Sequence, residues 1–260
     1  MTDSALPTRT RARITAVTSG KGGVGKTFVA ANLAAALAQR GERVLVLDAD
    51  LGLANLDVVL NLHPKITLHD VFIGKHRLED AIVPVAGGFS VLLAGSGMVE
   101  YSRLTPEVRD QLLETIEAVT PRFDRVLLDT GAGISDVVLF TLSLAHDVLI
   151  VTTPEPTAMT DAYATIKVLV ATQARRELLL AVNQTLKSGE GRTIRNQLQL
   201  VIDRFVNPGL DTPVRLEFVG ELPVDPAVRE AVQRRQLLLE LYPGSPAAQA
   251  VLALAARVAL

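Results

Sequence analysis

Eight residues near the start of the chain have the types and spacing of a phosphate-binding loop. The segment GKGGVGKT, residues 20–27, matches the pattern G-x-x-x-x-G-K-[ST]. Its glycines allow backbone N–H groups to converge on phosphate oxygens, and a helix that begins there adds a favourable dipole. Lys26 would then reach the β- and γ-phosphates while the Thr27 hydroxyl coordinates Mg²⁺. The alternative, a glycine-rich turn with an incidental lysine, is disfavoured by the strand-like run before it and the helical run after it.

Aspartates at the ends of two apolar runs are candidates for metal binding and for water activation. The run RVLLDT carries Asp129 next to its last residue, and this acid would hold Mg²⁺ directly or through water. No glutamate follows Asp129, so the group that orders the attacking water must lie elsewhere. Asp48 and Asp50 end the run RVLVLDAD, Asp57 follows, and a carboxylate here could order that water against the γ-phosphate. The alternative is that these carboxylates are solvated turn formers.

The elements that must position these residues alternate regularly along the chain. We expect strands at residues 14–17, 43–50, 89–95, 125–130, 147–153, 177–183 and 214–223. We expect helices at 27–41, 106–119, 135–145, 157–174 and about 191–205, and from Pro226 and Pro246 onward. The strands are continuously apolar, as in a parallel sheet with both faces covered. The expected fold class is therefore α/β, a single doubly wound, mostly parallel sheet with right-handed crossovers and helices on both faces.

Ligands of such folds bind beyond the carboxyl ends of the strands. That rule directs attention to the strand-end segments of this chain, which are residues 20–27, 48–57, 129–133, 152–157, Asn183 and 223–225.

Composition excludes several classes of function. The net charge is −2, so no global field attracts nucleic acid or anionic lipid, and the absence of Trp argues against a base-stacking platform. The absence of Cys excludes disulfides, thiolate metal sites and a catalytic thiol. No apolar run has the length of a membrane span or of a secretory signal. We expect a cytoplasmic protein with a basic flexible tail at residues 1–13 and a single domain at 14–260.

The loop resembles the deviant Walker A motif, K-G-G-x-G-K-[ST], of the MinD/ParA family of ATPases, and the resemblance extends over nearly the whole chain from Ile14. It implies a P-loop ATPase domain that binds ATP and Mg²⁺, is monomeric without ATP and forms a sandwich homodimer with it. It also implies that Lys21 acts across the dimer on the ATP of the partner. Asp50 matches the water-positioning acid, and Thr27, Asp50 and Asp129 match the metal-linked residues. The implied nucleotide-binding residues are Gly20, Lys21, Gly22, Gly23, Val24, Gly25, Lys26, Thr27, Phe28, Asn183, Pro223, Val224 and Asp225, of which Asn183 and residues 223–225 surround adenine.

Two further segments are similar to one branch of this family. DTGAGIS and TTPEPTAMTDAYATIKVL resemble the flagellar-number regulators of the FlhG (FleN) type. This resemblance implies slow, partner-stimulated ATP hydrolysis that controls flagellar number and placement, partly by restraining a flagellar transcription activator. The implied partner is a flagellar regulator or a basal-body protein.

Other roles stay open at this point. The amino-terminal segment lacks the D-Q-A-x-x-L-R motif through which that branch contacts its GTPase partner. The final segment, SPAAQAVLALAARVAL, is apolar on all sides with one cation, Arg257, which favours packing on the domain over contact with lipid. Transient contact with the inner face of the cell membrane remains an alternative. So do septum placement, positioning of DNA or other cargo, and an ATP-gated interaction protein that hardly hydrolyses.

Overall fold

The computed structural model describes residues 11–52, 55–95 and 103–259. These residues form one eight-stranded sheet with the order β3-β4-β2-β5-β1-β6-β7-β8. All neighbours are parallel except β3 and β4, which are antiparallel. The strands are β1 (Arg13–Ser19), β2 (Val44–Ala49), β3 (Ile82–Pro84), β4 (Ser90–Leu92), β5 (Arg125–Ala132), β6 (Asp147–Thr152), β7 (Glu177–Thr185) and β8 (Arg215–Pro223).

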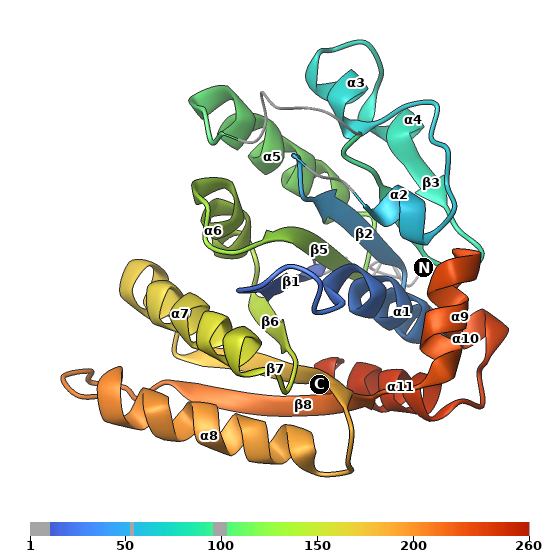
Figure 1. Ribbon diagram of the computed structural model, residues 1–260. Coiled ribbons are helices and arrows are strands. Elements are labelled where there is room, and N and C mark those ends of the chain that lie inside the picture. Colours follow the sequence, from blue (N-terminus) through green and yellow to red (C-terminus); the bar gives the residue numbers. More distant parts are fainter. Residues whose placement is uncertain (1–10, 53–54, 96–102, 260) are drawn as a thin grey trace, which may run out of the picture.

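Helices cover both faces of this sheet (Figure 1). The helices are α1 (Lys26–Gln39), α2 (Leu56–Val59), α3 (Leu68–Phe72), α4 (Leu78–Ala81), α5 (Pro106–Val119), α6 (Asp136–Ser143), α7 (Pro156–Gln173), α8 (Glu190–Phe205), α9 (Pro226–Arg234), α10 (Leu238–Leu241) and α11 (Pro246–Val258). One core lies between the sheet and α5, α6, α7 and α8, and a second lies between the sheet and α1, α10 and α11. The doubly wound α/β fold expected from the sequence is confirmed.

Helix α1 is the central helix of the second core. Every residue from Phe28 to Leu37 is buried. A helix that is apolar on all sides requires neighbours all round, and its many alanines let α11, α10 and the sheet approach closely. The helix begins directly after the glycine loop, so its burial fixes the position of the loop relative to the sheet.

Both edges of the sheet carry features that hinder the addition of a further strand. At one edge, β3 has three residues and ends in Pro84, which has no N–H to donate. At the other edge, the Gln199 carboxamide of α8 acts as a substitute strand: its Oε1 accepts from Leu216 N at 2.8 Å and its Nε2 donates to Val214 O at 2.9 Å. Arg195 Nε donates to Leu216 O at 2.8 Å.

The carboxyl-terminal helix α11 is docked on the sheet. Its buried side chains are Ala247, Ala248, Val251, Leu254, Ala255 and Val258. The buried guanidinium of Arg125 donates to Val258 O at 3.1 Å, and Arg257 donates to Val219 O at 3.3 Å. Within the described ranges, the longest apolar stretch of any helix falls short of what crossing a membrane requires.

The structure differs from the expectation in short elements and at one end. Strand β3 and the four- or five-residue helices α2, α3, α4 and α10 were not expected. Strand β1 begins at Arg13, one residue earlier than expected, and Ala12 is buried. Arg13 also pairs with Asp147 of β6 at 2.5 Å. Ala12 and Arg13 thus belong to the fold, while residues 1–10 of the expected tail lie outside the described residues.

Candidate nucleotide-binding site

The glycine loop connects β1 to α1 and leaves space above its backbone. Gly23 and Gly25 have φ angles of +80° and +91°, which L side chains rarely adopt. A Cβ at Gly22 or Gly23 would meet nothing within 4 Å, so the loop is open on that side. At Gly20 a Cβ would lie 2.2 Å from the Asp161 carbonyl oxygen of α7, so the loop touches that helix by its backbone. Open backbone amides before a helix N-terminus form an anion cradle.

A cavity of about 650 Å³ opens over this cradle. It brings together Gly22, Gly23, Gly25, Lys26, Thr27, Phe28 and Asp50, which were expected at the site. The remaining lining residues are Asn55, Val58, Val59, Thr130, Ala132 and Val232. Asn55, Thr130 and Ala132 lie in strand-end segments that the sequence indicated without giving them a role. Val58 and Val59 of α2 and Val232 of α9 were missed, because single valines on short helices carry no chemical signal.

Lys26 lines the cavity and lies near the carboxylates of Asp129 and Asp50. Burial lowers the pKa of the Lys26 ammonium, and the charges of Asp129 and Asp50 oppose that shift. Burial raises the pKa of the Asp129 carboxyl to about 6, although the Thr27 hydroxyl and the Lys26 ammonium oppose the shift. These groups are therefore close enough to interact electrostatically, as a phosphate-binding lysine beside a metal-linked acid requires.

The residues present fit a magnesium ion held together with phosphate oxygens. Asp129 Oδ1 is buried and lacks a hydrogen-bond partner among the described residues, and the Thr27 hydroxyl interacts with the same carboxylate. Nowhere in the described part of the chain do three or more His, Cys, Asp or Glu side chains gather into a metal site. Magnesium suits such a place, because it binds few protein oxygens and completes its shell with water and substrate phosphates.

Asp48 holds the turn that carries Asp50. Its two carboxylate oxygens accept from Asp50 N at 3.1 Å and from Leu56 N at 3.4 Å. Burial and the nearby Asp129 raise the pKa of Asp48 well above its usual range. The Asp50 carboxylate itself lies against Gly131, whose Cβ would be 3.4 Å from it, at the end of β5. Asp50 therefore faces the cavity between β2 and β5, whereas Asp57 lies outside the cavity lining.

Lys21 points away from the cradle in this structure. Its Nζ lies 2.6 Å from Glu155 Oε2 and 2.9 Å from Thr157 Oγ1, at the start of α7. Both residues belong to the strand-end segment 152–157, for which the sequence suggested no specific role. The lysine stays partly accessible, with 37% of its side chain exposed.

The residues expected around adenine are not among those that line the cavity. Asn183 Nδ2 donates to Val24 O of the loop at 2.8 Å. Asp225 caps α9 through Ala227 N at 2.9 Å and also accepts from Ala247 N of α11 at 3.0 Å. Pro223 ends β8, and Val224 is 58% exposed. Asn183 thus contacts the loop backbone, whereas Asp225 contacts the first turns of α9 and α11.

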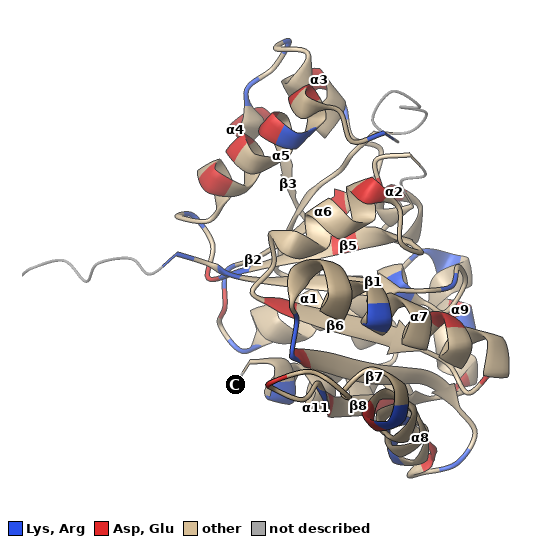
Figure 2. Ribbon diagram, turned by 90° about the vertical axis from the view of Figure 1, so that its left-hand side faces the viewer, with Lys and Arg blue, Asp and Glu red and all other residues tan. Residues whose placement is uncertain are grey.

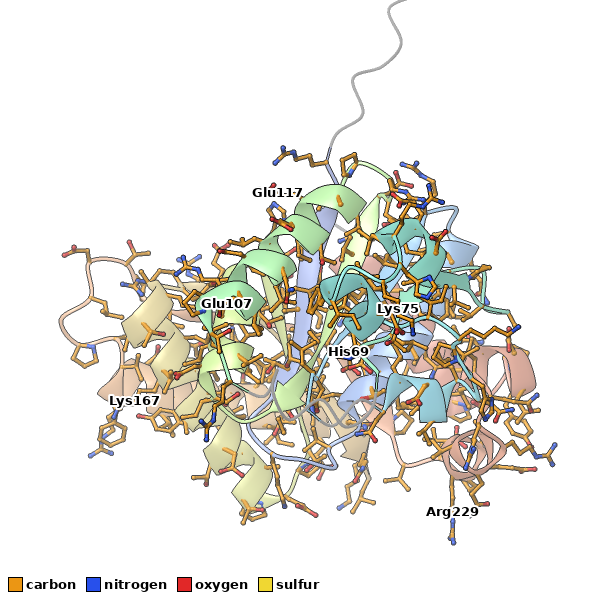
Figure 3. All side chains as sticks on the ribbon, turned by 90° about the horizontal axis from the view of Figure 1, so that it is seen from above. His69, Lys75, Glu107, Glu117, Lys167 and Arg229 are labelled. Atoms are coloured by element: carbon orange, nitrogen blue, oxygen red, sulfur yellow. The ribbon has the colours of Figure 1, made fainter. Side chains whose placement is uncertain are left out.

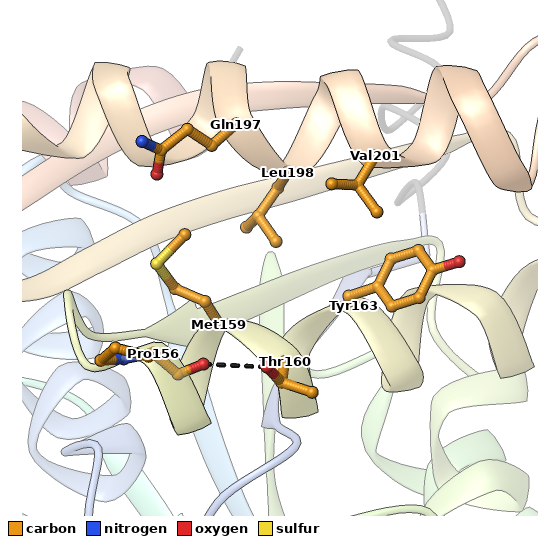
Figure 4. A pocket seen from close by; sticks show the side chains of 7 residues that line it. All are labelled: Pro156, Met159, Thr160, Tyr163, Gln197, Leu198 and Val201. Carbon is orange, nitrogen blue, oxygen red and sulfur yellow. Dashed lines mark hydrogen bonds between the residues drawn. The ribbon is translucent and has the colours of Figure 1, made fainter.

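A second cavity, of about 410 Å³, lies between α7 and α8 (Figure 4). Met159 and Tyr163 reach into it from α7, and Leu198 and Val201 reach into it from α8. Pro156, Thr160 and Gln197 complete the lining, and Thr160 Oγ1 donates to Pro156 O at 3.0 Å. A lining without a charged group offers nothing to bind a phosphate chain, so the loop cavity is the candidate site.

In the ribbon of the described residues, Lys and Arg positions are spread over several elements, with Asp and Glu positions among them (Figure 2). Charged side chains such as Lys167 of α7 and Arg229 of α9 project from opposite sides of the molecule (Figure 3). A duplex-binding protein usually gathers its cations on one face or along one helix.

Comparison with known proteins gives concordant matches. A family model described as "ParA: NUBPL iron-transfer P-loop NTPase" matches residues 10–259. The antiactivator FleN of Pseudomonas aeruginosa is 42% identical over 246 residues, which cover 95% of this chain and 86% of the relative. The flagellum site-determining protein YlxH of Helicobacter pylori is 33% identical over 91% of this chain and 78% of the relative. Among solved structures, the septum site-determining protein MinD of Pyrococcus horikoshii, complexed with Mg-ADP, matches with a TM-score of 0.73 and 29% identity, covering 95% of this chain and 96% of that one.

Proposed function

The chain belongs to the ParA family of P-loop NTPases, within which it is most like the FleN and FlhG type, and from this we propose that it is an ATP-dependent dimerising switch that controls flagellar number and placement. The observation that carries the proposal is the loop with two lysines, Lys21 and Lys26, in a chain 42% identical to an antiactivator.

The nucleotide is ATP with Mg²⁺, as in other members of the family. Lys26 and the loop amides bind the phosphates, and Thr27 and Asp129 would hold the metal, with Asp50 close by. When bound, Mg²⁺ neutralises charge on the β- and γ-phosphate oxygens. The open backbone at Gly22 and Gly23 supports this assignment, because a phosphate chain needs amides that no side chain covers.

Hydrolysis then requires an ordered water molecule. Asp50 faces the cavity from the end of β2, on a turn that Asp48 holds at both of its ends. We assign to Asp50 the orientation of the water that attacks the γ-phosphorus. The bond from that phosphorus to the β–γ bridging oxygen breaks, and ADP, inorganic phosphate and a proton are released. The hydrogen bond from Asp50 N to Asp48 supports this role, because it fixes the backbone from which the Asp50 carboxylate extends.

Lys21 supplies the link to dimerisation. A cation provided by a second subunit can neutralise charge on the γ-phosphate, as an arginine finger does. Lys21 is outside the cavity of its own chain and partly accessible, so it is free of the cis phosphate site and suited to reach another copy. ATP would then join two copies and hydrolysis would release them, with a turnover that is slow until a partner stimulates it.

The flagellar role is taken from the two relatives. One is named an antiactivator and the other a flagellum site-determining protein. We propose that this chain likewise restrains a flagellar transcription activator and contacts a flagellar regulator or basal-body protein in the cytoplasm. Docking of α11 through Arg125 favours this over constant attachment to a membrane.

The test is a capture from lysate with the Asp50→Ala variant and ATP, with Lys26→Ala as the matched control that lacks nucleotide. Mass spectrometry identifies the proteins that only the ATP-trapped form holds. Enrichment of a flagellar regulator or basal-body component supports the proposal. Enrichment of division or DNA-partition proteins instead would leave the ATPase cycle standing and refute the flagellar role.

A further inference from the structure

Asn183 makes a buried contact with the phosphate loop across 159 positions of sequence. It lies near the end of β7 and is 8% exposed. Its Nδ2 donates to Val24 O at 2.8 Å, and its Oδ1 accepts from Gln184 N at 2.9 Å. The amide orientation is unambiguous, because a carbonyl oxygen only accepts and a backbone N–H only donates.

The contact includes the backbone of the next loop residue. A Cβ at Gly25 would lie 2.4 Å from Asn183 Nδ2. Gly25 has a φ of +91° and directly precedes the first residue of α1. The loop and the Asn183 side chain therefore fit together only while position 25 is glycine and the side chain at 183 stays in place.

The frame that holds Asn183 is itself fixed. Gln184 has a φ of +60°, an uncommon conformation for a residue other than glycine, and its N–H meets Asn183 Oδ1. The next residue, Thr185, accepts from Val224 N at 2.9 Å and donates its hydroxyl to Leu222 O at 3.3 Å. The side chain of Asn183 is thus held by a segment that is tied to the neighbouring strand.

The direction of the Val24 carbonyl determines the direction in which the N–H of Gly25 points. A peptide unit is planar and trans, so its C=O and N–H point in opposite directions. With Val24 O turned toward Asn183, the N–H of Gly25 points the other way. Phosphate binding by such a loop depends on amides that converge on one point. We propose that Asn183 is a positioning residue of the phosphate loop, which turns the amide of Gly25 toward the phosphates.

This inference rests on the proposed ATP site but makes a separate claim about it. A residue that reads the base changes the preference between nucleotides. A residue that shapes the loop changes the affinity for any ligand with a triphosphate, including one without a base. The two roles are therefore distinguishable by ligand choice.

The experiment compares wild type with Asn183→Ala and with Asn183→Asp, which keeps the size and the acceptor but loses the donor toward Val24. Gln199→Ala is the matched control, because its carboxamide also bridges a backbone N–H and a backbone C=O, near the opposite end of the adjacent strand β8. Circular dichroism establishes that each variant is folded. Dissociation constants are measured for ATP, GTP and inorganic tripolyphosphate, each with Mg²⁺.

A second readout needs no ligand. Trypsin cleaves after lysine, so Lys21 and Lys26 report directly on the loop, and the rate of cleavage at these two sites is measured without nucleotide. A loop released from Asn183 should open more often and be cut faster.

We expect both Asn183 variants to bind all three ligands more weakly by one common factor of roughly tenfold or more. Cleavage at Lys21 and Lys26 should be faster in both and unchanged in Gln199→Ala. Loss of ATP affinity alone, with tripolyphosphate affinity unchanged, overturns the proposal and makes Asn183 a base-reading residue. If wild type binds none of the three ligands, the proposed ATP site is refuted. The trypsin cleavage rates then test the positioning role alone, and unchanged rates in the Asn183 variants refute it.

Discussion

Lys21 Nζ and Glu155 Oε2 of the same chain lie 2.6 Å apart. A lysine that is proposed to act on the ATP of a second subunit is thus held by an acid of its own subunit. The two side chains are 37% and 62% exposed, so the ion pair stabilises this position of Lys21 by only a small free energy, about 1 kcal/mol at most. Such a contact can shift the equilibrium between monomer and dimer toward the monomer without preventing dimerisation.

Glu155→Gln should therefore promote ATP-dependent dimerisation, because the lysine no longer has to leave an ion pair. The ATP analogue concentration that gives half dimer should fall about two- to fivefold. Analytical ultracentrifugation with a non-hydrolysable analogue measures it, and Glu117→Gln on α5 is an exposed control. A higher concentration requirement would mean that Glu155 holds Lys21 across the dimer.

Lys26→Ala and Asp50→Ala should separate binding from hydrolysis. The first removes the cation of the cradle and should abolish nucleotide binding. Asp50→Ala leaves the phosphate loop intact. This variant should bind ATP, form the dimer and stay dimeric, because it does not hydrolyse the ATP. Phosphate release and gel filtration with ATP measure both steps. Hydrolysis by Asp50→Ala at the wild-type rate would show that another residue orders the water.

Gly20→Ala should destabilise the fold through a backbone collision. Its Cβ would lie 2.2 Å from the Asp161 carbonyl oxygen of α7, and helix backbone cannot move aside as a flexible side chain can. Such overpacking costs about 1–3 kcal/mol. Urea denaturation without nucleotide measures it. Gly22→Ala is the control, because its Cβ would meet nothing within 4 Å, and an equal loss in both variants would rule out the collision.

Asp129 should give the apoprotein an unusual dependence of stability on pH. Burial raises the pKa of its carboxyl in the folded protein to about 6, above the ordinary value of 3.8, so between these pH values the folded state binds more protons than the unfolded state. The free energy of unfolding should therefore fall as pH rises through this window, by roughly 3 kcal/mol for this group. Urea titrations in EDTA at pH 4 to 7 measure it for wild type and for Asp129→Asn.

The difference in unfolding free energy between these two proteins is the informative quantity. The asparagine resembles the protonated carboxyl and does not titrate, so wild type should lose stability relative to the variant as pH rises. A difference that stays constant with pH would mean that Asp129 has an ordinary pKa in the folded protein.

Helix α11 should remain docked when the nucleotide changes. The chain contains no cysteine, so a single introduced thiol reports on one position only. Val251→Cys places it at a buried site of α11, and Ala253→Cys places it on the exposed side of the same helix. Maleimide should label the second quickly and the first slowly, with ADP and with the ATP analogue alike. Rapid labelling of position 251 with ATP would demonstrate release of the helix.

The main elements of the fold could be predicted because their signals are local. Strands such as β2 and β6 are unbroken apolar runs, and helices such as α5 and α11 start at a proline after a threonine or serine cap. Helices of four or five residues have too few turns for a periodic pattern. The structure forms α2 and α3 around one fully buried leucine each, Leu56 and Leu68, which tertiary packing selects.

The site likewise has a part that the local sequence predicts and a part that it does not. The cradle and its acids follow from spacing along the chain, whereas Lys21 meets Glu155 and Asn183 meets Val24 across more than a hundred residues. No local pattern encodes such pairs. The resemblance assigned Lys21 to a partner subunit and Asn183 to adenine, and the structure adds the contacts that each makes within its own chain.

The partly covered edges of the sheet bear on how the protein behaves at high local concentration. A bare edge strand offers backbone groups to any other copy and permits growth without limit toward aggregates. Here Pro84 ends one edge strand and the Gln199 carboxamide covers part of the other. Addition of a strand at these positions is thereby disfavoured, and copies that meet there at high local concentration have to make contact through side chains instead.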